Sequence, residues 1–222
     1  MIHNNEFVND YKTYIGNKNF ACVAAKAALA KQQLHAMVAD HMACPVSDKL
    51  ILDFLYAFVD EYRKSENLYH SAAIIFKQPQ EISEAMFEKF LWQRLQALSD
   101  LDAKQFGYDK RVQSNPSSAD FSFSLKGEAF FIIGLHPNNS RQARQFKTPA
   151  IVFNPHHQFE QLRQTDKYRH LQHAVRKRDV ELSGSINPML HDFGEESEVY
   201  QYSGRKYGSE WECPLKIKHE RA

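Results

Sequence analysis

The pattern of hydrophobic and polar residues divides the chain into a helix-rich first half and a strand-rich second half. In the first half, apolar residues recur every three or four positions within long segments, as in amphipathic helices, and two shorter runs are typical of strands. Serines stand where two of the helices should begin, and a serine side chain can accept a hydrogen bond from the first helical turn. Helices are therefore predicted over Phe7–Ile15, Cys22–Ala30, Ser47–Tyr62 and Ser83–Leu98, and strands over Leu34–Asp40 and Ser71–Phe76. The apolar face of the third helix should comprise Leu50, Ile51, Phe54, Leu55, Phe58 and Val59.

The second half opens with a predicted β-hairpin. Large apolar residues alternate with serines over Phe121–Leu125, so this strand should have one face in solvent. Lys126-Gly127 would form the turn. The run Ala129–Ile133 is apolar on both faces, which predicts a strand in the interior of the sheet.

Beyond the hairpin we expect one more strand, one helix and an irregular end. The strand is predicted over Ala150–Phe153, the helix, rich in Arg and His, over Asp166–Leu182, and the irregular segment over Ser183–Pro214. The turn-rich run Gln113–Ser118 has the length of an ordinary loop and is interpreted as a loop inside one domain. The predicted fold class is α+β: a single domain over residues 1–222, with a mainly antiparallel sheet packed with several helices.

Composition and charge narrow the possible partners. Of the 222 residues 43% are hydrophobic, which is enough to bury a core. Lys+Arg number 28 and Asp+Glu 27, giving a net charge of +1, which provides no electrostatic argument for binding nucleic acid or an anionic membrane. The local basic run Arg176-Lys177-Arg178 ends at Asp179 and is predicted to be a solvated helix face.

The sequence carries no sign of export. Its N-terminus lacks the basic and apolar regions of a signal peptide, and its longest apolar run is far below the roughly 18 residues that a spanning helix needs. Cys22, Cys44 and Cys213 are too scattered for a disulfide framework, and none forms C-x-x-C. We expect a reduced, cytoplasmic protein.

Four polar segments in the second half carry the candidate chemistry. In two of them a predicted strand ends at a histidine next to a proline. The end of a strand holds side chains rigidly and can expose them to a cleft. The same sequences could be simple strand-terminating turns. The four segments are Gly134–Arg141, Phe153–Glu160, Gly184–Pro188 and Gln201–Arg205.

Together with three further motifs, these segments resemble the YqcI/YcgG family. The pattern reads G-L-H-P-x-x-S-R-x-A-R, F-N-P-H-x-Q-F-E-x-L-R, R-x-R-D, G-S-x-N-P-x-L, S-E-x-x-Q-Y-S-G-R and W-x-C-P. It is carried by Gly134–Arg144, Phe153–Arg163, Arg176–Asp179, Gly184–Leu190, Ser197–Arg205 and Trp211–Pro214, and an N-terminal Cys followed by Ala-Lys fits at Cys22 with Ala25-Lys26. The resemblance spans most of the chain and is densest after residue 130.

The resemblance implies heme. Family members with an assigned activity include the heme-dependent N-hydroxylase of the guanitoxin pathway, which hydroxylates a guanidine nitrogen. The chain has no C-x-x-C-H motif, so heme b would be bound without covalent attachment. His136, which ends the most apolar strand, and Cys22, near a helix N-terminus whose dipole favours a thiolate, are the two candidate axial ligands of the iron. Chemistry favours Cys22, because a thiolate assists O–O cleavage, whereas sequence position favours His136, and the choice stays open.

Other residues receive roles around this cofactor. His156 is a candidate distal or orienting group, and Glu160 or Glu198 could receive a cationic guanidine or amine. The cations that could hold the heme propionates are Arg141, Arg144 and Arg205. His170 and His173 are spaced i, i+3, but the Glu-x-x-His pattern of di-iron bundles is absent, so both are predicted to be exposed.

The leading hypothesis is a heme-dependent oxygenase that transfers oxygen to a nitrogen of a small amine or guanidine, with His156 and Glu160 as catalytic residues. Dioxygen is the oxidant, and a separate donor protein must supply electrons, because the chain has no flavin, NAD or ATP motif. A homodimer is left open. One alternative is a non-heme iron oxygenase with His136, His156 and Glu160 as a facial triad. The other is a heme-binding or heme-sensing protein without turnover.

Overall fold

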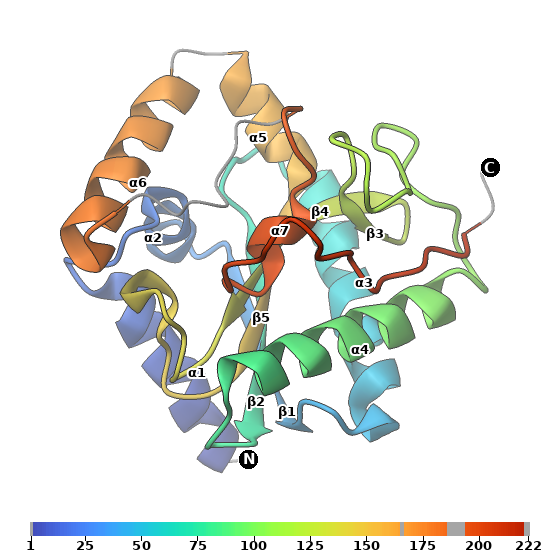
Figure 1. The fold of residues 1–222 in the computed structure, drawn as a ribbon, viewed down its shortest axis with the longest axis horizontal. Helices are drawn as coiled ribbons and strands as arrows, with labels where there is room; N and C mark the ends of the chain where they lie inside the picture. Colours follow the sequence, from blue (N-terminus) through green and yellow to red (C-terminus); the bar gives the residue numbers. More distant parts are fainter. Residues whose placement is uncertain (1, 165–166, 186–193, 220–222) are drawn as a thin grey trace.

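A five-stranded sheet forms the centre of the protein (Figure 1). The computed structural model describes residues 2–164, 167–185 and 194–219. The strands lie in the order β1-β2-β5-β4-β3; β1 and β2 are parallel, and every other pair is antiparallel. The α+β class with a mainly antiparallel sheet is thus confirmed. The strands are β1 (Leu34–His41), β2 (Ser71–Gln78), β3 (Phe123–Leu125), β4 (Glu128–Leu135) and β5 (Ala150–Pro155).

Helices cover both faces of this sheet (Figure 1). Helices α3, α4 and α7 pack on one face, in a core cluster that includes Phe87, Phe130 and Tyr202, while α1 and α2 pack on the other face. Within the described residues, no helix is both long and apolar enough to span a membrane. The α-helices are α1 (Ile2–Gly16), α2 (Val23–Ala30), α3 (Asp48–Lys64), α4 (Glu84–Asp102), α5 (His156–Arg163), α6 (Lys167–Ser183) and α7 (Val199–Tyr202), and short 3₁₀ turns are η1 (Pro45–Ser47) and η2 (Gln142–Arg144).

One of the two predicted serine N-caps is present in the structure. Ser83 caps α4 as predicted, since its hydroxyl accepts a hydrogen bond from the Met86 backbone at 3.2 Å. Ser47 also precedes its helix, but η1 comes directly before it and leaves Ser47 in a helical conformation with no side-chain cap. The predicted apolar face of α3 was wrong at Leu50, which is 65% exposed near the helix start.

The hairpin forms as predicted, but its solvent face does not. Lys126 and Gly127 both have positive φ, as a tight turn between twisted strands requires. Strand β4 lies between β5 and β3, so it is an interior strand. Ser122 and Ser124, however, are fully buried. The Ser122 hydroxyl donates to Glu198 at 2.7 Å and that of Ser124 accepts from the Asp109 backbone at 3.1 Å, so protein groups replace the expected water.

Gly134 lies where two helices pack closely against the sheet. A Cβ at this position would lie 2.6 Å from Phe87 Cε1 and 2.9 Å from the Tyr202 carbonyl oxygen. Helices α4 and α7 therefore approach β4 closely enough to exclude any side chain, which is why glycine opens the G-L-H-P motif.

We expect Gly134→Ala to destabilise the fold by about 1–3 kcal/mol, the usual cost of adding atoms to a packed core. Urea unfolding followed by circular dichroism measures this. Gly208→Ala is the matched control, because an added Cβ there meets nothing within 4 Å. Equal midpoints for the two variants would show that α4 and α7 can move away at little cost.

Candidate functional site

Cys22 lies at the N-terminus of α2 and not inside the helix. Its sulfur accepts a hydrogen bond from the Ala25 backbone at 3.5 Å, so the thiol is the helix N-cap. Burial raises the pKa of the Cys22 thiol, while backbone hydrogen bonds from Ala25 and Ala24 and the positive charge of Arg178 act in the opposite direction. Cys22 is thus a half-buried residue on which two sources of positive potential act, a helix N-terminus and a guanidinium.

Arg178 comes to this place from α6, which packs against α2. Its Nη1 atom is buried and has no hydrogen-bond partner within the described part of the chain. In the basic run of α6 only Lys177 is exposed, whereas Arg176 and Arg178 are half-buried. The prediction of a solvated helix face was therefore wrong for these two arginines, because α6 turns them toward α2 and η2.

A third segment, η2, also lies near Cys22. The Tyr14 hydroxyl donates to the Ala143 carbonyl oxygen at 3.0 Å, and η2 packs against α6. Burial raises the pKa of Tyr14 far above its ordinary value, although the nearby Arg144 charge opposes the shift. Three motifs that are far apart in sequence, at residues 22, 141–144 and 176–178, thus meet in one place.

His136 lies on the other face of the sheet. Its imidazole is fully buried and stacks on Phe87, with ring centroids 4.4 Å apart. The Asn139 side-chain oxygen accepts from the Arg141 backbone, so its amide nitrogen faces His136 Nε2 at 3.0 Å and donates to it. The ring proton is thereby assigned to Nδ1, which is buried and has no partner among the described residues. Burial lowers the pKa of His136 to about 4.

His156 begins α5 and belongs to a separate polar network. Its Nε2 lies 3.2 Å from Glu160 Oε1, and its Nδ1 lies 3.3 Å from the Ser122 hydroxyl. Glu198 is buried behind it and accepts hydrogen bonds from Ser122 at 2.7 Å and from the Tyr202 hydroxyl at 2.5 Å. The structure thus brings His156, Glu160 and Glu198 together, as residues of one network.

The register of β4 and β5 keeps the two histidine motifs apart. Leu135 pairs with Ala150 and Phe130 pairs with Pro155, so the strands end at opposite edges of the sheet. Six strand positions between Phe130 and His136 correspond to about 20 Å. His136 and His156 therefore do not converge on one ion, and the residues that the structure describes contain no group of three or more His, Cys, Asp or Glu able to hold a metal.

The predicted propionate-binding arginines each contact protein groups. Arg141 donates to the Ser185 carbonyl oxygen at 2.7 Å, Arg144 to that of Gln201 at 2.5 Å, and Arg205 to the Glu88 carboxylate at 2.6 Å. His173 is exposed, as predicted, and the side chain of His170 lies outside the described residues.

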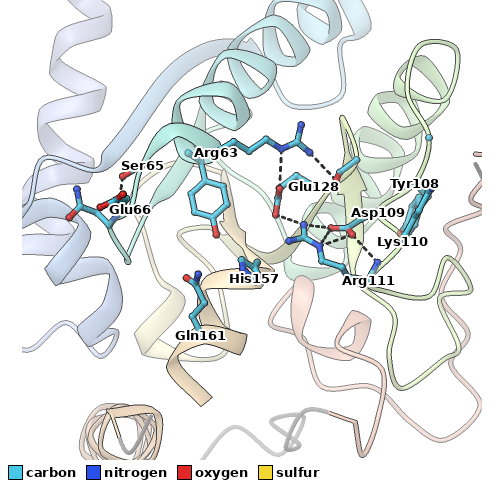
Figure 2. Close-up of a pocket in the computed structure, with 14 residues that line it drawn as sticks. Arg63, Ser65, Glu66, Tyr108, Asp109, Lys110, Arg111, Glu128, His157 and Gln161 are labelled. Carbon is cyan, nitrogen blue, oxygen red and sulfur yellow. Dashed lines mark hydrogen bonds and ion pairs between the residues drawn. The ribbon is translucent and has the colours of Figure 1, made fainter. Parts of the chain in front are cut away.

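Two adjoining cavities form at the turn end of the β3–β4 hairpin, and Figure 2 shows the larger one, for which no site was predicted. They measure about 730 and 250 Å³ and share four lining residues, Asp109, Lys110, Arg111 and His157. His156 and Glu160 line the smaller one. For the larger cavity, a possible signal in the sequence was a charged residue, Glu128, directly before the most apolar run.

Comparison with known proteins fits the motif pattern. A model of the YqcI/YcgG family matches residues 11–216. The chain belongs to the YqcI/YcgG family. Comparisons with curated proteins and with solved structures gave no match.

The YqcI/YcgG match includes Cys22, both histidine motifs and all residues that line the two cavities. It runs from Tyr11, which packs in the core of the α1 face, past Cys22 and both histidine motifs to Lys216. Within this family pattern Gly204 has a clear physical role. It adopts a φ of +84°, and an added Cβ would lie 2.8 Å from both Arg144 and Asn139. The S-G-R motif thus fits closely around the side chain that links η2 to α7.

The buried neutral state of His136 predicts a pH-dependent stability. The unfolded histidine titrates near 6.5 and the folded one near 4, so only the unfolded chain takes up this proton between these values. The free energy of unfolding should therefore decrease as the pH is lowered from 6.5 to 4, by up to about 3 kcal/mol in total. Urea titrations at pH 7.5 and 4.5 should show a smaller loss for His136→Gln than for the natural chain. The exposed control His173→Gln should lose as much as the natural chain, and equal losses in all three would refute the assignment.

Proposed function

We propose that this protein is a heme-dependent oxygenase that hydroxylates or oxygenates a nitrogen of a small amine or guanidine. The observation that carries the proposal is the position of the Cys22 thiol at the N-terminus of α2, where the charge of Arg178 acts on it, together with the buried Nη1 of Arg178, which has no hydrogen-bond partner among the residues that the structure describes. Dioxygen would be the oxidant, and electrons would come from a separate donor protein. The free thiols of Cys22, Cys44 and Cys213 are consistent with the reducing cytoplasm in which we place the reaction.

The surroundings of Cys22 fit an axial ligand of heme iron. The sulfur already accepts a backbone hydrogen bond at a helix N-terminus, and both this dipole and Arg178 stabilise a thiolate once a metal displaces the proton. A thiolate-ligated heme supplies oxygen activation, because the ligand pushes electron density toward the O–O bond. His136 fits this role less well, since its Nε2 is held by Asn139 and its ring is stacked on Phe87.

Arg178 fits a heme propionate. A buried guanidinium nitrogen without a partner is costly, and a carboxylate is the group that a guanidinium binds best. Aromatic side chains of the core on this face, including Tyr11, Tyr14 and Phe146, supply apolar surface near the thiol. Arg178 therefore joins Arg144 as a candidate cation for the cofactor.

The proposal does not depend on His156 and Glu160. These residues line a cavity to which Cys22 does not contribute, and Glu160 is already paired with Arg163. The reaction centre that we propose consists of Cys22, Arg178, Arg144 and the aromatic residues beside them.

The ligand assignment is tested by the absorption spectrum of the heme-loaded protein. We expect the ferrous–CO form to show the strongly red-shifted Soret band of thiolate ligation, and Cys22→Ser to lose this band. Cys44→Ser is the matched control, because Cys44 is also a half-buried residue that precedes a helical turn. His136→Gln should leave the band in place. A heme spectrum that changes in His136→Gln and not in Cys22→Ser would overturn the assignment to Cys22, and a natural chain with no Soret band would overturn the heme proposal.

Turnover is tested separately. We expect the heme-loaded protein, given dioxygen and a reductant, to convert at least one member of a panel of small amines and guanidines into an N-oxygenated product detectable by mass spectrometry. Cys22→Ser should form at least about tenfold less product, since losing even an outer-shell partner of a metal ligand typically reduces activity by about that factor. Heme binding without product across the panel would instead indicate a heme sensor.

A further inference from the structure

The larger cavity at the hairpin is built from five separate segments of the chain (Figure 2). The end of α3, the loop before β2, residues 107–111, the hairpin turn and the first turns of α5 all line it. Its volume of about 730 Å³ lies within the range of small-molecule binding sites. Cys22 and His136 do not line it, so it is distinct from the proposed heme site.

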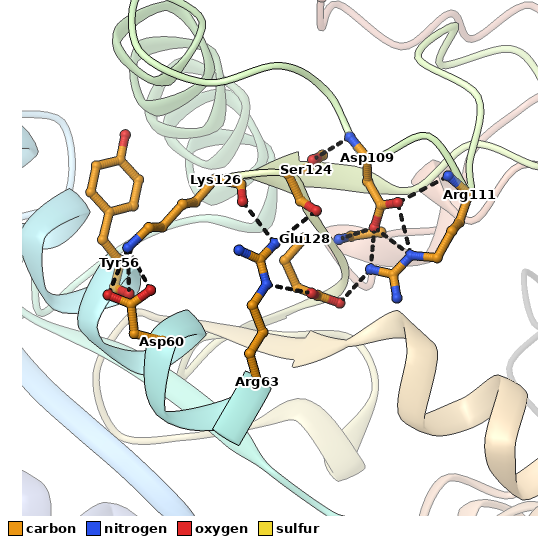
Figure 3. Close-up of polar contacts among 10 residues, drawn as sticks. Tyr56, Asp60, Arg63, Asp109, Arg111, Ser124, Lys126 and Glu128 are labelled. Atoms are coloured by element: carbon orange, nitrogen blue, oxygen red, sulfur yellow. Dashed lines mark hydrogen bonds and ion pairs between the residues drawn. The ribbon is translucent and has the colours of Figure 1, made fainter. Parts of the chain in front are cut away.

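Two buried carboxylates hold the wall of this cavity in place (Figure 3). Glu128 is 3% exposed and accepts from Arg63 Nε at 3.3 Å through one oxygen and from Arg111 Nη2 at 2.7 Å through the other. Asp109 accepts from Arg111 at 2.6–3.1 Å and from the Ala129 backbone at 2.8 Å. Both acids are therefore used in fixing two guanidinium groups and have no oxygen left without a hydrogen bond.

The groups left over in the cavity wall are mainly hydrogen-bond donors. Nη1 of Arg63 and Nη1 of Arg111 take part in none of the hydrogen bonds that hold these arginines to the protein. Lys110, which is exposed, and His157, which is half-buried, have no hydrogen-bond or ion-pair partner within the described segments of the chain. Their positions around one hollow, with His157 facing Arg111 from α5, favour a ligand rich in acceptors (Figure 2).

The charges of the wall decide where an anion would bind. Around the larger cavity the positive charges of Arg63, Lys110 and Arg111 face Glu66 and the two acids already paired with arginines. Glu66 is exposed, whereas Lys110, Arg111 and His157 lie on the wall shared with the smaller cavity. The smaller cavity also contains Asp120 and Glu160, which disfavour an anion there.

We propose that the larger cavity binds a small metabolite bearing an oxyanion, a carboxylate or a phosphate, through Lys110, His157 and the outward-facing nitrogen of Arg111. The guanidinium is held by Asp109 and Glu128 before the ligand arrives, so little side-chain entropy is lost on binding. The remaining volume accommodates the rest of the metabolite. This site is independent of the heme proposal.

Calorimetric titration of the full-length protein tests the site, with inorganic phosphate, succinate and glycerol as probes at constant ionic strength. We expect saturable binding of phosphate or succinate, and which of the two binds identifies the oxyanion. Lys110→Ala and His157→Ala should each weaken it by about tenfold, the effect of one charge-assisted hydrogen bond. These variants remove side chains that have no hydrogen-bond or ion-pair partner among the described residues, so they should fold normally, as circular dichroism can verify.

Lys104→Ala is the matched control, because Lys104 is an exposed lysine outside both cavities. Its affinity for the anion should equal that of the natural chain. The proposal is overturned if neither anion binds saturably, if glycerol binds as well as the anions, or if Lys104→Ala weakens binding as much as Lys110→Ala. The Lys110→Ala variant should bind heme as the natural chain does. A failure of the oxyanion-site proposal can therefore be distinguished from a failure of the heme proposal.

Discussion

The antiparallel pairing of β4 with β5 is the constraint that determines where the two histidine motifs lie in the structure. Its register, from Phe130 opposite Pro155 to Leu135 opposite Ala150, sends the two His-Pro motifs to opposite edges of one sheet. The alternation of side chains along β4 then sets their faces. Gly134 faces Phe87 of α4, while Leu135 packs in the core beneath α1. His136, two positions after Gly134, follows it to the α4 face, so Cys22 on the α2 side cannot share an iron with it.

Local patterns predicted most of the elements because local physics forms them. The helical spacing before Lys64 and the turn at Lys126-Gly127 depend on neighbouring residues alone, and these predictions were confirmed. The Ser122–Ser124 face failed for the opposite reason. Its burial depends on Glu198, 76 residues away from Ser122, and on the loop at Asp109. The alternation of apolar and polar residues along a strand contains no information about partners so distant in sequence.

The candidate site was predictable only where a single residue carried the signal. Cys22 could be singled out because it stands at the start of an alanine-rich helix, where the helix dipole favours a thiolate. Arg178 did not, because a basic residue on a helix normally points to solvent, and only the packing of α6 against α2 buries it. The hairpin cavity was also missed. The net charge of +1 does not reveal that Arg63 and Arg111 form ion pairs with Glu128 and Asp109, whereas Lys110 has no ion-pair partner in the part of the chain that the structure describes.

Arg144 connects the two faces that the sheet separates. Its carbonyl oxygen accepts from the His136 backbone, its guanidinium donates to the last turn of α7, and its charge acts on Tyr14 beside Cys22. From α7, Tyr202 continues the contacts to Glu198, Ser122 and His156. Gly204 leaves room for this arginine where any side chain would collide with it. The arginine in the S-R-x-A-R motif therefore holds the thiol side, the buried histidine and the short helix in one fixed relation, and this explains physically why motifs so far apart in sequence form one pattern.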